Sequence, residues 1–197
     1  MGTRISQIFT LLGLVILAFI IAGVIWFMMI SPLRIMKPLE FIPLEITEEH
    51  YESVNSKLNS FIASERHIKF NKYEVGALLI ESIRGELMLD ITEIYIDFQN
   101  HEIMVILKTR IDDIPSLGYW QRIFKRRKID YTTTMIHAAI GVSDGAIIYD
   151  IKDFRFGGFK IPEFIIRRIV REGRREFQDI YLEDISFTDE TMGVTRR

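Results

Sequence analysis

The sequence predicts an α+β protein in which a single N-terminal transmembrane helix is followed by a long twisted antiparallel sheet packed by two amphipathic helices. Three patterns predict this class: an uncharged apolar run near the N-terminus, alternating apolar and polar residues through much of 68–156, and two segments with helical spacing of apolar residues. The order of these segments, which is helix, strands, helix and strand, is typical of α+β domains.

The apolar run predicts a membrane anchor. No charged residue occurs between Arg4 and Arg34, and every residue of 11–30 is apolar or glycine. About twenty residues at ~1.5 Å each form a helix of about 30 Å, the thickness of the hydrocarbon core of a bilayer. The run is longer than the apolar region of a signal peptide, and bulky residues follow it where a peptidase needs small ones. We therefore expect a tail at 1–7 and an uncleaved transmembrane helix at 8–30.

The remaining chain divides into a stalk and one domain. Three prolines punctuate 31–45, which predicts a stalk, and 46–197 has the length of one ordinary domain. Arg4 and the N-terminal amine balance Arg34 and Lys37, so the positive-inside rule does not orient the chain. A short tail before a long domain predicts a single-pass protein of the cell membrane whose C-terminal domain is extracytoplasmic, in the periplasm or at the cell surface.

The domain begins with a predicted amphipathic helix of about 17 residues. Thr47 is a suitable N-cap, and the carboxylates of Glu48 and Glu49 favour the positive end of a helix. One apolar stripe follows at helical spacing, formed by Tyr51, Val54, Leu58, Phe61 and Ile62.

Alternation with a period of two predicts strands from Ile68 to Ile111, including 87–91. The phase changes near Thr92-Glu93, which predicts a bulge, and 99–102 has the character of a hairpin turn. A second hairpin is predicted from 131–141 and 146–156, because Asp-Gly between alternating segments is a strong hairpin signal.

A second amphipathic helix is predicted to begin at Pro162, where a missing N–H costs nothing. Ile165 and Ile169 lie on its apolar face, and arginines occupy much of the rest. A closing strand at 182–187 is predicted to turn at Asp189-Glu190 into 192–194.

The helix start at Thr47, the two hairpins, the segment 142–148 and the segment 156–162 (Phe-Gly-Gly-Phe-Lys-Ile-Pro) resemble the YpmS-type family of membrane-anchored bacterial proteins. More loosely, they resemble tubular lipid-binding (TULIP-like) domains. The resemblance covers about 40–195. It implies an apolar groove between helix and sheet that could hold lipid chains, and it implies no catalytic residues.

Enzymatic and metal chemistry find little support in the sequence. Gly141 to Gly145 match G-x-S-x-G, but a strand-like segment follows Ser143 where a nucleophile elbow needs a helix, and all four histidines precede it. No two histidines have a metal-binding spacing, and His137 lies within a predicted strand. The absence of cysteine excludes thiol nucleophiles and thiolate metal sites. We expect no enzymatic activity, no cofactor and no metal.

A basic aromatic stretch is the most suggestive surface segment. It carries five cations with interleaved aromatic and apolar residues, and its candidate residues are Tyr119, Trp120, Arg122, Ile123, Phe124, Lys125, Arg126, Arg127 and Lys128. Three interpretations stay open: a membrane-surface segment, a surface for a partner protein, and a solvated loop whose aromatics lie in the core. A net charge of −2 and the predicted location argue against nucleic acid.

The leading functional prediction is a membrane-anchored, non-enzymatic domain that binds an apolar ligand, a lipid, in a groove between helix and sheet. The candidate groove residues are Tyr51, Val54, Leu58, Phe61, Ile62, Ile165 and Ile169. The alternative is an accessory or scaffold subunit that docks onto a larger membrane protein complex. The two differ in whether the groove is open or filled by side chains of the protein itself.

Overall fold

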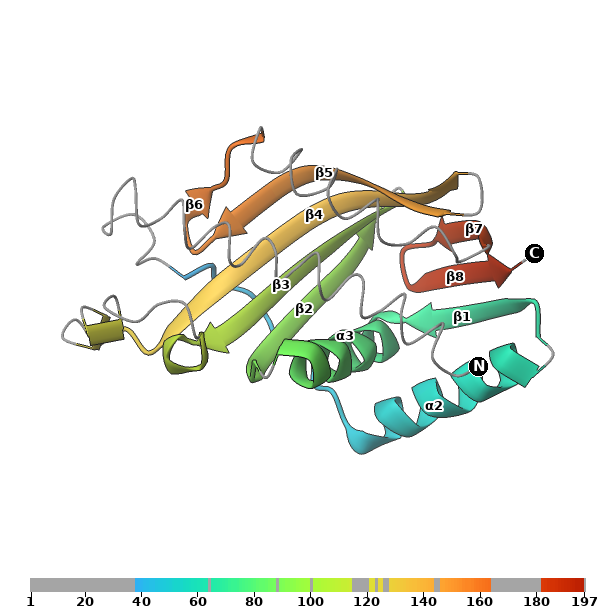
Figure 1. The fold of residues 1–197 in the computed structure, drawn as a ribbon, viewed down its shortest axis with the longest axis horizontal. Coiled ribbons are helices and arrows are strands. Elements are labelled where there is room, and N and C mark those ends of the chain that lie inside the picture. Colours follow the sequence, from blue (N-terminus) through green and yellow to red (C-terminus); the bar gives the residue numbers. More distant parts are fainter. Residues whose placement is uncertain are drawn as a thin grey trace.

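The computed structural model describes residues 38–63, 65–87, 89–99, 101–114, 121–122, 124–125, 128–143, 146–163 and 182–196. The predicted tail at 1–7 and transmembrane helix at 8–30 lie outside these ranges. Within the described ranges, no helix has the length and apolar character needed to cross a membrane. The described chain is an α+β fold with two α-helices and two antiparallel sheets (Figure 1).

The elements follow the order of the sequence. The helices are α2 (Glu48–Ala63), α3 (Lys72–Leu87) and the short 3₁₀-helix η1 (Ile111–Asp113). The larger sheet has the order β2-β3-β4-β5-β6 and comprises Ile91–Gln99, Glu102–Arg110, Tyr131–Ser143, Ala146–Phe156 and Phe159–Lys160. The smaller sheet has the order β1-β8-β7 and comprises His67–Asn71, Thr191–Arg196 and Leu182–Phe187.

Both predicted hairpins are confirmed in the larger sheet. β2 and β3 pair with Gln99 opposite Glu102, and their register shifts between Ile91 and Glu93, where the phase change predicts a bulge. β4 and β5 pair with Ser143 opposite Ala146. Alternating burial along these strands gives the sheet one apolar face and one more polar face, as period-two patterning requires.

The prediction of one long sheet is wrong, because the chain forms two. β1 pairs with β8, so that Ile68 lies opposite Val194, and β7 pairs with the other edge of β8. Alternation identifies strands but does not tell which of them pair across most of a domain. The two sheets are in contact through β4 and β7, and the rings of Phe98 and Phe187 lie 5.6 Å apart between their centroids.

The prediction of strand structure across 72–87 is also wrong, because these residues form α3. The Asn71 side-chain oxygen accepts the N–H of Glu74 at 2.9 Å, and the Glu74 carboxylate accepts the N–H of Asn71 at 2.9 Å. This reciprocal pair is a capping box, which starts a helix. Val75, Leu79 and Ile83 are fully buried at helical spacing, and α3 packs on β2. The second amphipathic helix predicted after Pro162 lies outside the described residues from 164 onward.

The first amphipathic helix is confirmed as α2. It begins directly after Thr47, whose N–H donates to His50 Nδ1 at 3.0 Å while the His50 N–H donates to the Thr47 carbonyl at 3.1 Å. The main contacts of α2 are with α3 and β1. It therefore forms an outer layer over α3 and the smaller sheet (Figure 1).

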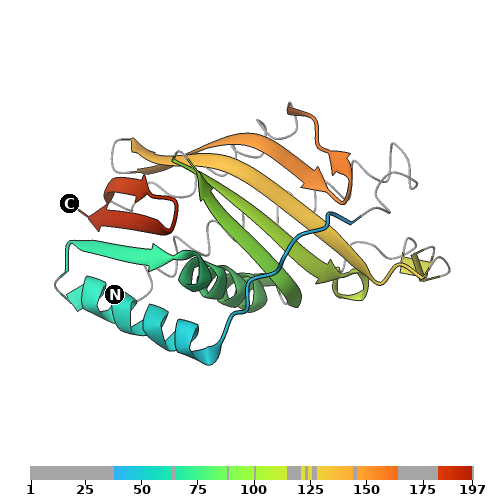
Figure 2. The same cartoon turned by 180° about the vertical axis from the view of Figure 1, so that it is seen from behind.

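Residues 38–46, which we call the strap, lead into α2 across one face of the larger sheet (Figure 2). This is the more polar face, because Leu39 contacts Thr133, whose partner on β3 is Lys108. The Leu39 N–H donates to Thr133 Oγ1 on β4 at 2.9 Å, and the Leu44 N–H donates to the Ile94 carbonyl on β2 at 2.7 Å. At its other end, Ile46 lies so close to Gly76 of α3 that a Cβ there would be 2.9 Å from Ile46 Cδ1. The described part of the predicted stalk is thus docked on the domain.

Candidate functional site

The larger sheet has one apolar face, to which β2, β3, β4 and β5 all contribute. Strand pairing places opposed residues on the same face. The apolar face comprises Ile94, Ile96 and Phe98 of β2, Ile103, Val105, Leu107 and Thr109 of β3, Thr132, Thr134, Ile136, Ala138 and Ile140 of β4, and Tyr149, Ile151, Phe154 and Phe156 of β5. Of the described helices, α3 packs on β2, at one side of this face, and α2 lies beyond α3.

Three hydroxyl groups on the apolar face are buried and have no hydrogen-bond partner among the described residues. They belong to Thr109, Thr132 and Tyr149. Thr109 and Thr132 are opposed across β3 and β4 and are only 2% and 6% exposed. Tyr149 lies further along the face, opposite Ile140, and burial raises the pKa of its phenol well above the ordinary value of 10.0. A buried polar group without a partner costs about 1–3 kcal/mol, so each of these hydroxyls requires an explanation.

The predicted groove residues on α2 lie elsewhere. Val54 and Phe61 are buried in the hydrophobic core, and Tyr51 and Leu58 pack against that core. Ile62 is half-buried. Since α2 mainly contacts α3 and β1, this stripe is held against a helix and a strand of the smaller sheet. Ile165 and Ile169, the other two groove candidates, lie outside the described residues.

The basic aromatic stretch is described only in part. Phe124 is buried in the core, whereas Arg122, Lys125 and Lys128 are exposed. The Lys125 ammonium lies 3.0 Å from a carboxylate oxygen of Asp112. The described aromatic residue therefore serves packing, and the described cations face solvent. The other candidates of this stretch, Tyr119, Trp120, Ile123, Arg126 and Arg127, lie outside the described residues.

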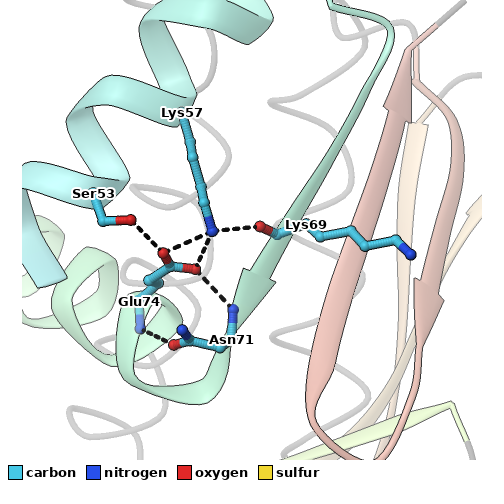
Figure 3. Close-up of polar contacts among 5 residues, drawn as sticks. All are labelled: Ser53, Lys57, Lys69, Asn71 and Glu74. Carbon is cyan, nitrogen blue, oxygen red and sulfur yellow. Dashed lines mark hydrogen bonds and ion pairs between the residues drawn. The ribbon is translucent and has the colours of Figure 1, made fainter.

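The carboxylate of Glu74 on α3 is also buried, at 3% exposure, and has partners on two other elements, α2 and β1 (Figure 3). It accepts hydrogen bonds from Ser53 Oγ at 2.5 Å, Lys57 Nζ at 2.7 Å and the Asn71 N–H at 2.9 Å. Lys57 also donates to the Lys69 carbonyl at 3.0 Å. We call Ser53, Lys57, Asn71 and Glu74 the Glu74 cluster. It joins α2 to the first turn of α3 and the end of β1.

The Glu74 cluster has a structural role. Burial by itself would raise the pKa of Glu74, but the hydrogen bonds from Lys57, Ser53 and the Asn71 N–H together outweigh burial and lower it. A carboxylate that is ionised and already accepts from these donors is poorly placed to take a proton from a substrate. The role of the cluster is therefore to attach α2 to α3 and β1.

The remaining polar candidates fit structural roles. His137 Nε2 lies 2.6 Å from a carboxylate oxygen of Glu102 on the neighbouring strand. Across the described ranges, no group of three potential metal ligands is close enough to hold an ion. Ser143 ends β4 and pairs with the first residue of β5, so a strand follows it rather than the helix of a nucleophile elbow.

The three unpartnered hydroxyls and the Glu74 cluster are not among the sites predicted from the sequence. Both left a signal. Thr109 and Thr132 occupy positions that the alternation of β3 and β4 assigns to the apolar face, where a polar residue is unusual. The spacing Asn71-x-x-Glu74 before an apolar run is the sequence pattern of a capping box.

Comparison with known proteins adds no assignment. No family model, no curated protein and no solved structure matches this chain. The resemblance to YpmS-type proteins and TULIP-like domains stays a prediction from the sequence.

Proposed function

We propose that this chain is a single-pass membrane-anchored protein without enzymatic activity, whose extracytoplasmic domain binds a lipid against the apolar face of the larger sheet. The observation that carries the proposal is the set of unpartnered hydroxyls of Thr109, Thr132 and Tyr149 on that face. A ligand that satisfies them must be apolar along most of its length and must carry oxygen atoms that can accept or donate hydrogen bonds. A lipid has both properties.

The spacing of the hydroxyls supports an elongated ligand. Thr132 and Ile140, the residue opposite Tyr149, are both on β4 and are separated by a strand length of about 26 Å. The side chains between them on this face of β4 are Thr134, Ile136 and Ala138. An amphiphile lying along β4 would place apolar groups over the middle of the face and polar groups near its ends.

Binding accounts for these hydroxyls better than catalysis does. A threonine acts as a nucleophile only when a base lies within hydrogen-bond reach. Among the described residues, none forms a hydrogen bond with the hydroxyl of Thr109 or Thr132. These hydroxyls are therefore available to form hydrogen bonds with a ligand.

Two adjacent alanines on β4 provide a matched test. Ala138 lies on the apolar face and is buried, whereas Ala139 lies on the opposite face, between Glu102 and Asp150. We expect the full chain, extracted in mild detergent, to carry lipid in native mass spectrometry. Ala138→Phe should remove that lipid, because the ring fills space over the face, and Ala139→Phe should retain it.

Other results would contradict the proposal. If the wild-type chain carries no lipid, or if Ala138→Phe and Ala139→Phe retain it equally, the apolar face is not the binding surface. If Ala138→Phe instead lowers the free energy of unfolding by about 1–3 kcal/mol with no change in lipid, the face is already filled by the protein itself. A wild-type chain that holds a partner protein and no lipid would favour the accessory-subunit alternative.

A further inference from the structure

We infer that the domain stands on the membrane with one particular end of its larger sheet against the bilayer surface. That end, which we call the Tyr131 end, comprises η1, residues 128–133 and the described residues from 121 to 125. The opposite end of β4 is the Ser143 end. The inference rests on the proposed membrane anchor, and it adds how the domain is oriented and which surface meets the lipid.

The length of chain between the anchor and the strap limits where the domain can be. The predicted transmembrane helix ends at Ile30, and the strap is docked from Leu39. Eight intervening residues, 31–38, span at most about 29 Å when fully extended. Leu39 must therefore lie within about 29 Å of the bilayer surface.

The hydrogen bond of Leu39 fixes which end of the sheet is near. Leu39 donates to Thr133, two residues from the start of β4. Ser143 is ten residues further along β4 than Thr133, which is about 33 Å at the rise of an extended strand. This distance exceeds the reach of the tether. A domain that stands on the membrane therefore presents the Tyr131 end to it, and only a domain that lies flat could bring Ser143 equally close.

The segment around η1 is part of the same end. The Ile111 N–H donates to the Asp130 carbonyl at 2.9 Å, and the Ile129 N–H donates to the Phe124 carbonyl at 3.1 Å. Gln121 Nε2 donates to the Ile111 carbonyl at 3.4 Å. With Phe124 buried in the core, these bonds hold the described cations of the basic aromatic stretch beside the start of β4.

The surface of the Tyr131 end suits a bilayer interface. Tyr131 is 39% exposed, and Ile42 of the neighbouring strap is 84% exposed; tyrosine is enriched at the interfacial level of a membrane. The exposed cations at this end are Arg110, Arg122, Lys125 and Lys128, and the nearby carboxylates are Glu40, Asp112, Asp113 and Asp130. The described part of this end thus has no excess negative charge to be repelled by anionic head groups.

The end of the strap that leads into α2 is less suitable to face the membrane. It leads into the start of α2, where exposed acidic side chains gather: Glu45, Glu48, Glu49 and Glu52. An anionic surface would repel them. Charge therefore favours the Tyr131 end over the α2 start as the surface near the membrane.

The chain contains no cysteine, so single cysteines can be introduced for labelling. We would place a fluorophore at Asp130→Cys or at Ser143→Cys, two exposed positions at opposite ends of β4. The full chain would be reconstituted into vesicles of phosphatidylcholine and phosphatidylglycerol that contain a lipid with a nitroxide on its head group. We expect several-fold stronger quenching at position 130 than at position 143.

Equal quenching at the two positions, or stronger quenching at position 143, would overturn the inference. Extraction of the same vesicles with alkaline carbonate separates this failure from failure of the proposed function. A chain that stays in the membrane but shows equal quenching has the anchor without the proposed orientation. A chain that alkali extracts has no anchor, and the inference fails together with the membrane part of the proposed function.

Discussion

Two sets of buried polar atoms in this protein differ in how their hydrogen bonds are satisfied. The carboxylate of Glu74 is buried among Ser53, Lys57 and the Asn71 N–H, all of which donate to it. The hydroxyls on the apolar face are buried and have no partner in the part of the chain that the structure describes. Burial is expensive in both cases, but only the first set offsets its cost within the chain. The difference separates polar groups that hold the fold together from polar groups that are available to a ligand.

The comparison predicts its largest effect at Lys57. Replacing it by methionine keeps an apolar stem of similar length but leaves the buried Glu74 carboxylate without its cation. Breaking a buried ion pair from one side costs about 3–5 kcal/mol, and the 39% exposure of the Lys57 side chain places this case toward the lower value. Urea unfolding of the full chain in mild detergent measures the loss.

Lys69→Met is the matched control, because the Lys69 side chain is exposed and only its carbonyl contacts the Glu74 cluster. It should change the free energy of unfolding little. The double variant Lys57→Met/Glu74→Gln should recover part of the loss, since it removes the unpaired charge. Equal effects of Lys57→Met and Lys69→Met would mean that the Glu74 cluster does not attach α2.

A smaller effect is expected on the free energy of unfolding at acidic pH. The pKa of Glu74 is lowered in the folded state, below its ordinary value of 4.5. Its ionised form therefore contributes stability that is fully present above pH 4.5 and is lost as the pH falls through the lowered pKa. Glu74→Gln should be less stable than the wild type near neutral pH, and the difference should shrink in acid. Unfolding curves at a series of pH values measure it, and a difference that grows below pH 4.5 would contradict the assignment.

The sequence was sufficient for the strands whose partners are close along the chain. Alternation and the turn residues predicted both hairpins, and the change of phase predicted the bulge near Glu93. Thr47 and the two glutamates after it predicted the start of α2. These features depend on neighbouring residues, which local patterns encode directly.

The sequence was not sufficient to predict elements whose structure depends on contacts between distant segments. The run 77–80 of α3 is apolar at every position, so its period is ambiguous, and Gly76 and Gly85 lower its helix propensity. Gly76 is explained only by the close approach of Ile46 from the strap. Likewise, no local sequence pattern indicates that Ile68 pairs with Val194. The unpartnered hydroxyls could be suspected from two threonines at apolar positions, but their lack of partners follows only from three-dimensional packing.

The central claim is that the hydroxyls of Thr109 and Thr132 serve a bound lipid, and the double variant Thr109→Val/Thr132→Val tests it most directly. Valine keeps the shape of threonine and removes the hydroxyl. Thr109→Ser/Thr132→Ser is the matched control, because it keeps both hydroxyls and removes the methyl groups. The measurement is the free energy of unfolding of the delipidated chain, with the amount of lipid that each variant retains before delipidation.

In the valine variant, stability and bound lipid should change in opposite directions. Its free energy of unfolding should rise by about 1 kcal/mol per substitution, because neither position then buries an unsatisfied hydroxyl, while its bound lipid should fall. The serine variant should lose stability and keep its lipid. A valine variant that is less stable than the wild type, or that retains lipid in full, would contradict the claim.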